Sequence, residues 1–180
     1  MNDLLLLAML LDGPKYGYQL KREAGWIMGQ DDLHNNIVYP LMRRFLDEGW
    51  VSKKAAPGEC GQTRQQYALT ADGRCSLFER LNAFSDNDAA SEGAFRLRLG
   101  VFPGLQPSAR EAILTGREKY LLRRDHKLET LQGKMDLGKF GGEIVRYMRK
   151  QIEMELEWIG HLRRMTKSMS AKTKDDRRPS

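Results

Sequence analysis

The sequence predicts a mainly α-helical protein that carries one two-stranded hairpin. Three observations predict this class. Apolar residues recur at helical spacing up to Gly49 and again beyond residue 107. Between Gly49 and Thr70 the spacing changes to the alternation of a strand. The chain has 180 residues, of which 41% are hydrophobic, enough to build one large domain or two small ones.

Two short helices are expected first. One covers the apolar residues 2–12, and either Asn2 or Asp3 can cap its start. The other covers residues 15–25 and is expected to stop at Gly25.

A third helix is expected over residues 34–48. It places Val38, Met42 and Phe45 on one face, which we expect to meet the core. Pro40 lies on the opposite face, where its missing N–H costs one hydrogen bond and any kink falls outside the core. Three polar residues crowd the start of this helix: His34, Asn35 and Asn36. One of them is expected to cap the helix, and the other two are then left for another role.

A hairpin follows the third helix, with a Pro- and Gly-rich tip at residues 56–63. Thr70 is then expected to cap a fourth helix, in which Leu77 and Leu81 share a face. This order of elements is that of a winged helix-turn-helix domain, and an arbitrary small α+β domain is the alternative.

The character of the chain changes after residue 84. We expect a winged helix-turn-helix domain over residues 1–84, a small and polar linker over 85–92, a domain of two long helices over 93–170, and a disordered tail over 171–180. The last helix, at about residues 142–169, carries an apolar stripe typical of a coiled-coil-like dimerisation contact. The stripe consists of Ile144, Met148, Ile152, Leu156, Ile159 and Leu162.

Several classes of function are not expected. The sequence has no Gly-rich phosphate loop, nucleophile elbow or metal-ligand spacing, so we expect neither an enzyme nor a cofactor. Cys60 and Cys75 are expected to be reduced thiols. The apolar run of residues 4–11 is shorter than the roughly 20 residues of a membrane span, so a cytoplasmic protein is expected.

The net charge of +6 suggests a polyanionic partner, but it lies outside the expected DNA-binding domain. Residues 1–84 hold ten basic and ten acidic residues, so the whole excess lies beyond residue 84. A nucleic-acid interface must therefore depend on local placement. The N-terminal residues of a second helix in a helix-turn-helix meet base edges in the major groove, and asparagine can bond adenine there. The hairpin would supply phosphate contacts, or it is an edge kept soluble by lysine.

Three motifs resemble, in order and spacing, the signature of PadR-like transcriptional regulators. They are GPKYGYQLKRE at residues 13–23, VYPLMRRFLDEGWV at 38–51 and GQTRQQYALTADG at 61–73, and the resemblance covers about residues 4–82. The resemblance implies a winged helix domain, a homodimer on a palindromic operator, and helical C-terminal dimer contacts. The two long helices look like those of the longer, virulence-activator-type subclass.

The resemblance also implies roles for single residues. Tyr18 and Tyr39 would contact the DNA backbone, the entrance of the third helix would enter the major groove, and residues 53–64 would be the wing. Together with the reasoning from the residues, this gives an expected DNA-binding set: Lys15, Tyr18, His34, Asn35, Asn36, Tyr39, Arg43, Arg44, Lys53, Lys54, Arg64 and Gln65.

The expected function is a sequence-specific, nucleoid-associated DNA-binding regulator, more specifically a homodimeric repressor. A winged helix used for protein–protein contact without DNA is the alternative. Some members of the family take an aromatic ligand, and Trp26 and Trp158 are the candidates for binding a small aromatic effector here. Ordinary core and dimer packing is the simpler explanation of these two side chains.

Overall fold

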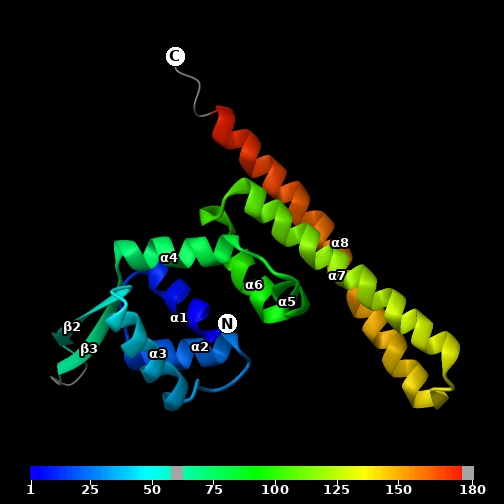
Figure 1. Ribbon diagram of the computed structural model, residues 1–180, viewed down its shortest axis with the longest axis horizontal. Helices are drawn as coiled ribbons and strands as arrows, with labels where there is room; N and C mark the ends of the chain where they lie inside the picture. The colour runs from blue at the N-terminus through cyan, green and yellow to red at the C-terminus, as the bar shows by residue number, and fades with distance from the viewer. Residues whose placement is uncertain (58–62, 176–180) are drawn as a thin grey trace. The chain divides into compact units, whose positions relative to one another are not determined.

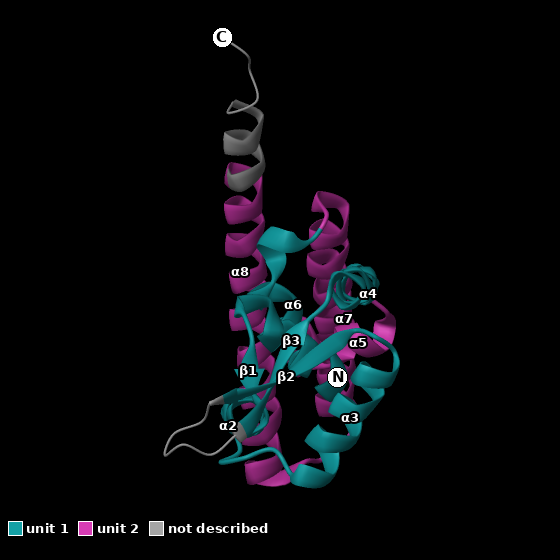
Figure 2. Cartoon of the chain, turned by 90° about the vertical axis from the view of Figure 1, so that its left-hand side faces the viewer, with its two compact units in different colours: residues 1–83, 96–105 teal, residues 84–95, 106–180 magenta. Residues whose placement is uncertain are grey.

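The computed structural model of the chain describes residues 1–57 and 63–175 (Figure 1). The chain divides into two compact units, residues 1–83 with 96–105 and residues 84–95 with 106–180 (Figure 2). The fold is mainly helical, with a winged helix in the first unit and long helices in the second, so the expected fold class is confirmed.

The first unit contains five helices, two short 3-10 turns and one small sheet among its described residues. One of these helices, α6, gives only its last residues to this unit. In chain order the elements are α1 (Asn2–Met9), η1 (Leu10–Asp12), β1 (Lys15–Tyr16), α2 (Gly17–Ile27), α3 (Asn35–Asp47), β2 (Val51–Pro57), β3 (Thr63–Leu69), α4 (Ala71–Asn82), α6 (Glu92–Gly100) and η3 (Phe102–Gly104).

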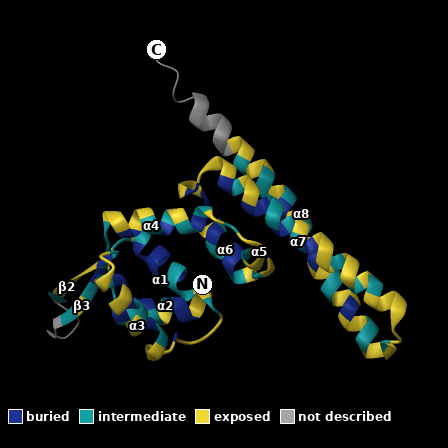
Figure 3. Cartoon of the chain, viewed as in Figure 1, coloured by how far each residue is buried: buried dark blue, intermediate teal, exposed yellow. Residues whose placement is uncertain are grey.

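The core of the first unit forms around α1, which packs against α2, α3 and α4. Leu6 and Leu7 of α1 are completely buried, as are Leu20 of α2, Phe45 of α3 and Leu77 of α4 (Figure 3). Each surrounding helix therefore has one apolar side fixed by the same central helix. The outward side of α3 follows from this packing.

The sheet has three antiparallel strands in the order β1-β3-β2. The hairpin of β2 and β3 is as expected, whereas β1 was expected to be the start of the second helix. Lys15 and Tyr16 instead pair with Tyr67 and Gln66 of β3. The expectation failed because two residues are too few to show a strand period, and only the long-range pairing makes them a strand. The hairpin tip, residues 58–62 with Cys60, lies outside the described residues.

The predicted helix ends were right in two places and wrong in three. Gly49, at φ +71°, follows α3, and the Thr70 hydroxyl accepts from the Gly73 N–H at 3.0 Å at the start of α4, both as predicted. At α1 the N-cap position is Met1 and no side chain caps it. His34 is the N-cap of α3, but its side chain makes no capping hydrogen bond.

The third error concerns Gly25, which does not end α2. The helix continues to Ile27, and Gly25 is buried inside it. A Cβ at this position would lie 2.6 Å from the Cα of Asp32, in the connection to α3. Glycine is needed here for the close approach of two backbone segments, not for a helix stop.

The second unit contains α5 (Asp86–Ala90), the start of α6, α7 (Pro107–Lys134) and α8 (Gly138–Asp175). Residues 85–92, expected to be a linker, thus include a helix. The Ser85 hydroxyl and the Asp88 carboxylate cap its start reciprocally, and Ala89 is buried where α5 packs on α7. The helix α8 also continues past residue 170 to Asp175. The division of the chain into domains at the expected boundaries stays a prediction.

Arg117 of α7 holds the second unit together. Its guanidinium is buried and donates to both carboxylate oxygens of Glu155 on α8, at 2.7 and 2.9 Å. It also donates to the backbone carbonyl of Ala89 on α5 at 2.7 Å. Three helices are therefore joined by one planar cation that has a partner in each direction.

The apolar stripe predicted on the last helix is divided between two sides. Ile152 and Ile159 are buried, together with Val145, whereas Ile144 is exposed. On α8, Arg149 and Arg163 form ion pairs with Asp125 and Glu118 of α7. Because these arginines lie next to Val145, Ile152 and Ile159, the three buried residues face α7 within the chain. The other stripe residues, Met148, Leu156 and Leu162, are half-buried. The buried part of the stripe serves the packing of this chain on itself.

We expect Gly25→Ala to lower the free energy of unfolding by about 1–3 kcal/mol, because the added methyl overlaps the backbone of Asp32. Urea unfolding followed by circular dichroism measures this. Gly160→Ala is the matched control, because Gly160 is also inside a helix but its nearest neighbour is the flexible Arg164 side chain at 3.8 Å. The control should be neutral or stabilise by up to about 1 kcal/mol. Equal losses for the two variants would contradict the close approach.

Asp3 makes the stability of the first unit depend on acid pH. Burial raises the pKa of this carboxyl, but hydrogen bonds from Arg80 and the Met1 amino group outweigh it and hold the pKa well below its usual range. Arg44 adds an ion pair at 3.6 Å. A depressed folded-state pKa stabilises the fold above the usual carboxyl pKa, and this contribution is lost as the pH falls below about 4.

Asp3→Asn should therefore lower the free energy of unfolding at pH 7 by about 1–2 kcal/mol. The difference from wild type should shrink as the pH is lowered from 5 to 3, because the Asp3 carboxyl then takes up a proton in the unfolded state while it stays charged in the folded state. Denaturant unfolding at pH 7, 5 and 3 measures both effects. A difference that stays constant over this range would show that the Asp3 charge contributes nothing.

Candidate nucleic-acid interface

The helix α3 presents its polar side outward because its apolar side is fully used. Val38, Met42 and Phe45 are each no more than 1% exposed. The polar and aromatic residues of the other side, with the N-cap, are exposed: His34, Asn35, Asn36, Tyr39, Pro40, Arg43 and Arg44. The orientation predicted for this helix is thus the observed one.

The entrance of α3 is open and polar. The exposed side chains of His34, Asn35 and Asn36 line a hollow of about 640 Å³. Asp31 and Asp32 line the same hollow. Lys21 of α2 forms an ion pair with Asp32 at 2.9 Å and so offsets one of the two negative charges.

Arg43 and Arg44 differ in their surroundings although both are exposed. The Arg44 guanidinium contacts Asp3 at 3.6 Å and Glu48 at 3.8 Å, and it lies over the ring of Phe45. Arg44 is thus engaged along the helix and back to α1. Arg43 lies on the outward side with Asn36 and Tyr39, so it is the better placed of the two for a contact outside the chain.

A second hollow, of about 490 Å³, lies where α2, α3 and the sheet meet. Four predicted residues come together here, along with Tyr16, Gly17 and Tyr67, which we did not predict. The whole set is Tyr16, Gly17, Tyr18, Tyr39, Arg64, Gln65 and Tyr67. We call this set the tyrosine hollow.

Aromatic stacking orders one side of the tyrosine hollow. The rings of Tyr16 and Tyr18 are stacked with centroids 5.8 Å apart, and the guanidinium of Arg64 lies 5.0 Å from the Tyr18 ring centroid. The Gln19 side chain accepts from the Tyr16 backbone N–H at 2.9 Å, which helps to fix the turn from β1 into α2. The cation from the hairpin is therefore held at the start of α2.

Tyr39 and Tyr67 form the other side. A Cβ on Gly17 would lie 3.4 Å from the Tyr67 ring and 3.5 Å from the Tyr39 ring, so both rings lie close to this glycine. Burial, and then the neighbouring Tyr39, raise the pKa of the Tyr67 hydroxyl. The Tyr67 phenol is therefore neutral at physiological pH. Arg64 is the one basic or acidic residue among those lining this hollow. Phenol hydroxyls beside a guanidinium suit a phosphate oxygen.

The lysines of the hairpin do not act as one cluster. Lys53 pairs with Tyr67 and Lys54 with Gln66, and successive residues of a strand point to opposite faces. The two exposed ammonium groups thus serve opposite faces of the sheet. Lys15 also pairs with Tyr67, but its ammonium group is 2.9 Å from the Glu23 carboxylate. The expected wing residue Gln65 is exposed and lines the tyrosine hollow.

The two tryptophans proposed for an effector lie in different units. Trp26, at the end of α2, is exposed and has the Arg22 guanidinium over its ring. Trp158 of α8 makes an edge-to-face contact with Phe95, with the ring centroids 6.1 Å apart.

Cys75 of α4 is a free, exposed thiol.

The described residues contain no cluster of three or more His, Cys, Asp or Glu side chains able to hold a metal ion. In the same part of the chain, no helix has the length and apolar character needed to cross a membrane.

Comparison with known families identifies the first part of the chain. Residues 6–79 match the transcriptional regulator PadR-like family, so this protein carries a PadR-family regulator domain there. The matched range is close to the one predicted from the three motifs. The comparison with curated proteins gave no match.

Solved structures of several regulators are similar to this chain. A transcriptional regulator of Thermoplasma acidophilum is 25% identical over 44% of this chain and 75% of its own, with a TM-score of 0.41. PadR of Bacillus subtilis, solved with operator DNA, is 21% identical over 91% of this chain and 98% of its own, with a TM-score of 0.44. A PadR-family regulator of Eggerthella lenta is 31% identical over 43% of this chain and 66% of its own, with a TM-score of 0.38.

The titration of Tyr67 tests the geometry of the tyrosine hollow. Tyr39→Phe should lower the pKa of Tyr67 towards its usual value, because the second hydroxyl no longer opposes ionisation, while the effect of burial remains. The pKa can be followed by NMR with 13Cζ-labelled tyrosine. Tyr147→Phe, at an exposed position in the other unit, should leave it unchanged. An unchanged Tyr67 pKa in Tyr39→Phe would show that the two hydroxyls are not neighbours.

Proposed function

We propose that this protein is a sequence-specific DNA-binding transcriptional regulator that acts as a homodimeric repressor on a palindromic operator. The observation that carries the proposal is the entrance of α3, where three polar side chains are exposed and none is used as a cap. A helix that only completed a core would have no need of them. The PadR-family domain at residues 6–79 gives the entrance its place in a DNA-binding fold.

His34, Asn35 and Asn36 are the proposed readers of base edges. They occupy the first turn of α3, which in helix-turn-helix proteins enters the major groove. An asparagine can bond the N6 and N7 atoms of adenine, and a histidine can donate to guanine acceptors. The hollow that they line has room for a base edge, and the ion pair of Lys21 with Asp32 reduces repulsion of the nearby phosphates.

The proposed contacts to phosphate come from a few placed groups, because residues 1–84 have no net charge. Arg43 on α3 is one proposed phosphate contact. Arg64, the cation of the tyrosine hollow, is another. The carboxylates of Asp3, Glu23 and Glu48 are engaged by basic side chains of the same unit, which limits their repulsion of DNA. Lys53 and Lys54 supply cations on the two faces of the wing.

Two half-sites of a palindrome require two copies of this domain. In a two-fold dimer the recognition helices would meet major grooves about one helical turn, roughly 34 Å, apart. Such a dimer would act at the nucleoid in the cytoplasm. A small aromatic effector bound near Trp158 would release it from the operator; the partly exposed Trp158 ring against Phe95 is the observation that favours this addition.

Asn35→Ala should weaken binding to the operator by about 10- to 100-fold, since one bidentate base contact is worth about 1–3 kcal/mol. Binding to unrelated duplexes should change little. Arg43→Ala should weaken binding to all duplexes alike and reduce the slope of log K against log salt by about one. Fluorescence anisotropy over a salt series measures both, on a duplex selected from random sequence by the wild-type protein.

Arg124→Ala is the control for Arg43→Ala, because it removes the same charge from an exposed position on α7. It should leave the salt slope unchanged.

The sharpest alternative is a winged helix that contacts another protein and no DNA. That alternative would hold if the selection from random sequence yields no bound duplex at low salt while the protein stays folded.

A further inference from the structure

The part of the chain beyond residue 84 carries the positive charge that the DNA-binding domain lacks. The whole chain has 30 basic and 24 acidic residues, and residues 1–84 hold ten of each, which leaves 20 basic and 14 acidic residues for the rest. The placement of these charges on the helices decides whether they form a surface or are engaged in ion pairs.

The helix α7 separates its acidic from its basic residues. Each of its four acidic residues forms an ion pair with an arginine of α8, at distances of 2.7 to 3.6 Å. The acidic residues are Glu111, Glu118, Asp125 and Glu129, and the arginines are Arg149 and Arg163. The acidic side of α7 therefore faces α8, and the side turned away from α8 is left to basic residues.

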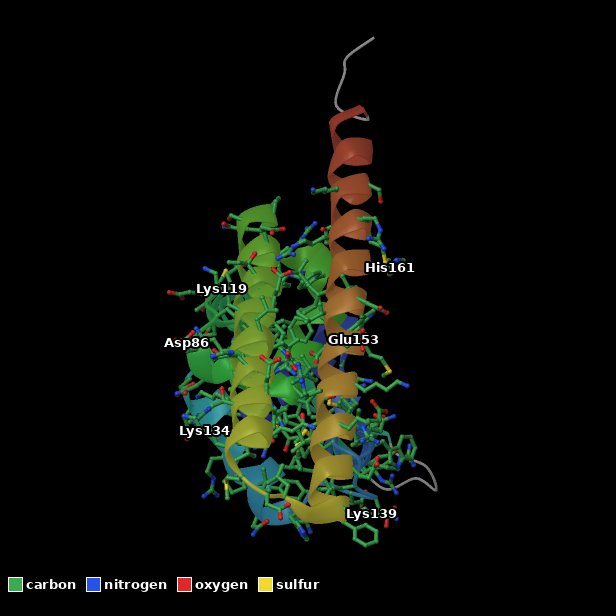
Figure 4. All side chains as sticks on the ribbon, turned by 90° about the vertical axis from the view of Figure 1, so that its right-hand side faces the viewer. Asp86, Lys119, Lys134, Lys139, Glu153 and His161 are labelled. Atoms are coloured by element: carbon green, nitrogen blue, oxygen red, sulfur yellow. The ribbon has the colours of Figure 1, made fainter. Side chains whose placement is uncertain are left out.

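Four basic residues follow one line along this outward side. Positions 119, 123, 127, 130 and 134 succeed each other at intervals of four, four, three and four residues, and Thr130 is the one that is not basic. At 100° per residue the four lie about 120–160° around the helix axis from Leu121, which is buried. Figure 4 shows Lys119 and Lys134 on the side of α7 away from α8. We call these four the basic row: Lys119, Arg123, Lys127 and Lys134.

The basic row is open to a partner, because all four of its residues are exposed. The Asp86 carboxylate of α5 lies 3.6 Å from the Arg123 guanidinium, but this carboxylate is itself 91% exposed. An ion pair of this kind is worth little and exchanges easily for another anion. The cations of the row can therefore turn to a partner without breaking any buried contact.

We propose that the basic row binds the phosphate backbone of double-stranded DNA outside the two operator half-sites. The proposal rests on the DNA-binding function put forward above, and it adds a second contact that does not depend on base sequence. Because both units belong to one chain, DNA held by the first unit raises the local concentration of phosphate for the second.

The length and chemistry of the basic row suit a phosphate backbone. From residue 119 to residue 134 the helix rises about 22 Å. A duplex of this length carries about 13 phosphates, so each cation can find one in many registers. Lysine and arginine side chains on a helix surface contact phosphates without reading bases.

The composition of the basic row argues against a protein or a membrane as the partner. A protein interface has an apolar core within its polar rim, and a membrane-surface helix combines basic residues with apolar side chains that enter the lipid. The basic row contains no apolar residue. The exposed Leu122 and Leu131 lie nine residues, and so about 180°, apart on α7 and form no common patch beside it. A partner that is held by charge alone is a nucleic-acid backbone.

Two duplexes test the proposal. The short one is the shortest duplex that keeps full affinity after selection from random sequence by the wild type, and the long one adds roughly 20 base pairs, about two helical turns, to each end. Fluorescence anisotropy over a salt series gives the ratio of the two affinities. The row variant replaces all four cations: Lys119→Gln, Arg123→Gln, Lys127→Gln and Lys134→Gln.

The row variant should bind the short duplex as wild type does, which also shows that it is folded. On the long duplex it should bind about 10- to 100-fold more weakly than wild type, because the flanking phosphates no longer contribute. The slope of log K against log salt should fall by about 0.9 for each lost phosphate contact, so by about 3 to 4 for each protomer.

A matched control removes the same charge from exposed positions of the same unit that lie off the row. It consists of Arg124→Gln, Lys139→Gln, Lys150→Gln and Lys167→Gln. The control should keep the wild-type ratio of the two affinities, because the total charge of the unit is not what holds the flanks. A row variant with the wild-type ratio, or a control that lowers the ratio equally, would overturn the proposal.

A cutting reagent tests the location without removing a charge. In protein whose Cys60 and Cys75 are replaced by Ser, iron-EDTA attached at Thr130→Cys should cut the flanks of the bound long duplex. The same reagent at Gln151→Cys, an exposed position on α8, should cut them less. Flanks left uncut from Thr130→Cys would contradict the proposal. Binding to phosphatidylserine vesicles that depends on the row, with no effect on either duplex, would assign the row to a membrane and overturn the proposal as well.

An unrelated duplex as long as the long one separates this proposal from the proposed function. Wild type that selects no operator but binds this duplex through the basic row would support the row and remove sequence-specific regulation. An operator bound equally by wild type and row variant at both lengths would support the regulator and remove the row. Binding to no duplex would overturn both.

Discussion

The burial of one side of α3 against α1 is the constraint on which the interface depends. Val38, Met42 and Phe45 are completely enclosed, and this fixes the rotation of the helix about its own axis. The rotation in turn decides that Asn35, Asn36 and Arg43 point outward. A protein interior is close-packed, so the helix cannot turn without opening a cavity, and the base-reading candidates are held by residues that never touch the partner.

Short contacts between backbones extend this constraint to the neighbouring segments. Gly25 lets the connection before α3 approach α2, because a Cβ there would lie 2.6 Å from the Cα of Asp32. A side chain at this position would separate two segments that the interface brings together. The tyrosine hollow is thus a result of packing between three elements, and its hydroxyls and Arg64 are placed before any partner arrives.

Charge is used locally in both units. Residues 1–84 have no net charge, and carboxylates such as Asp3 and Glu23 are engaged internally, so the cations that point outward are few. In the second unit Arg117 is buried with Glu155 and joins three helices. A buried pair of this kind contributes little net stability but strongly penalises arrangements that separate it, which makes the α7–α8 seam specific.

The sequence by itself determined the elements whose period is long and regular. It predicted α3 with its buried face, the hairpin, the cap at Thr70 and the two long helices, because helical and strand periods and turn residues are local signals. It also predicted the PadR-family domain, since each of the three motifs is a continuous stretch of sequence and their order and spacing can be read directly. The polar residues at the entrance of α3 were found in the same way.

Only the tertiary structure decided the rest. The strand β1 exists through its pairing with β3, Gly25 has its role through Asp32, and Tyr16 and Tyr67 reach the tyrosine hollow from segments about 50 residues apart in the sequence. The single apolar stripe read on α8 became two, because apolar residues at neighbouring helical positions look alike in sequence and differ only in what covers them. The local periodicity of a sequence does not encode which distant segments pack together. This is the physical reason for each of these differences.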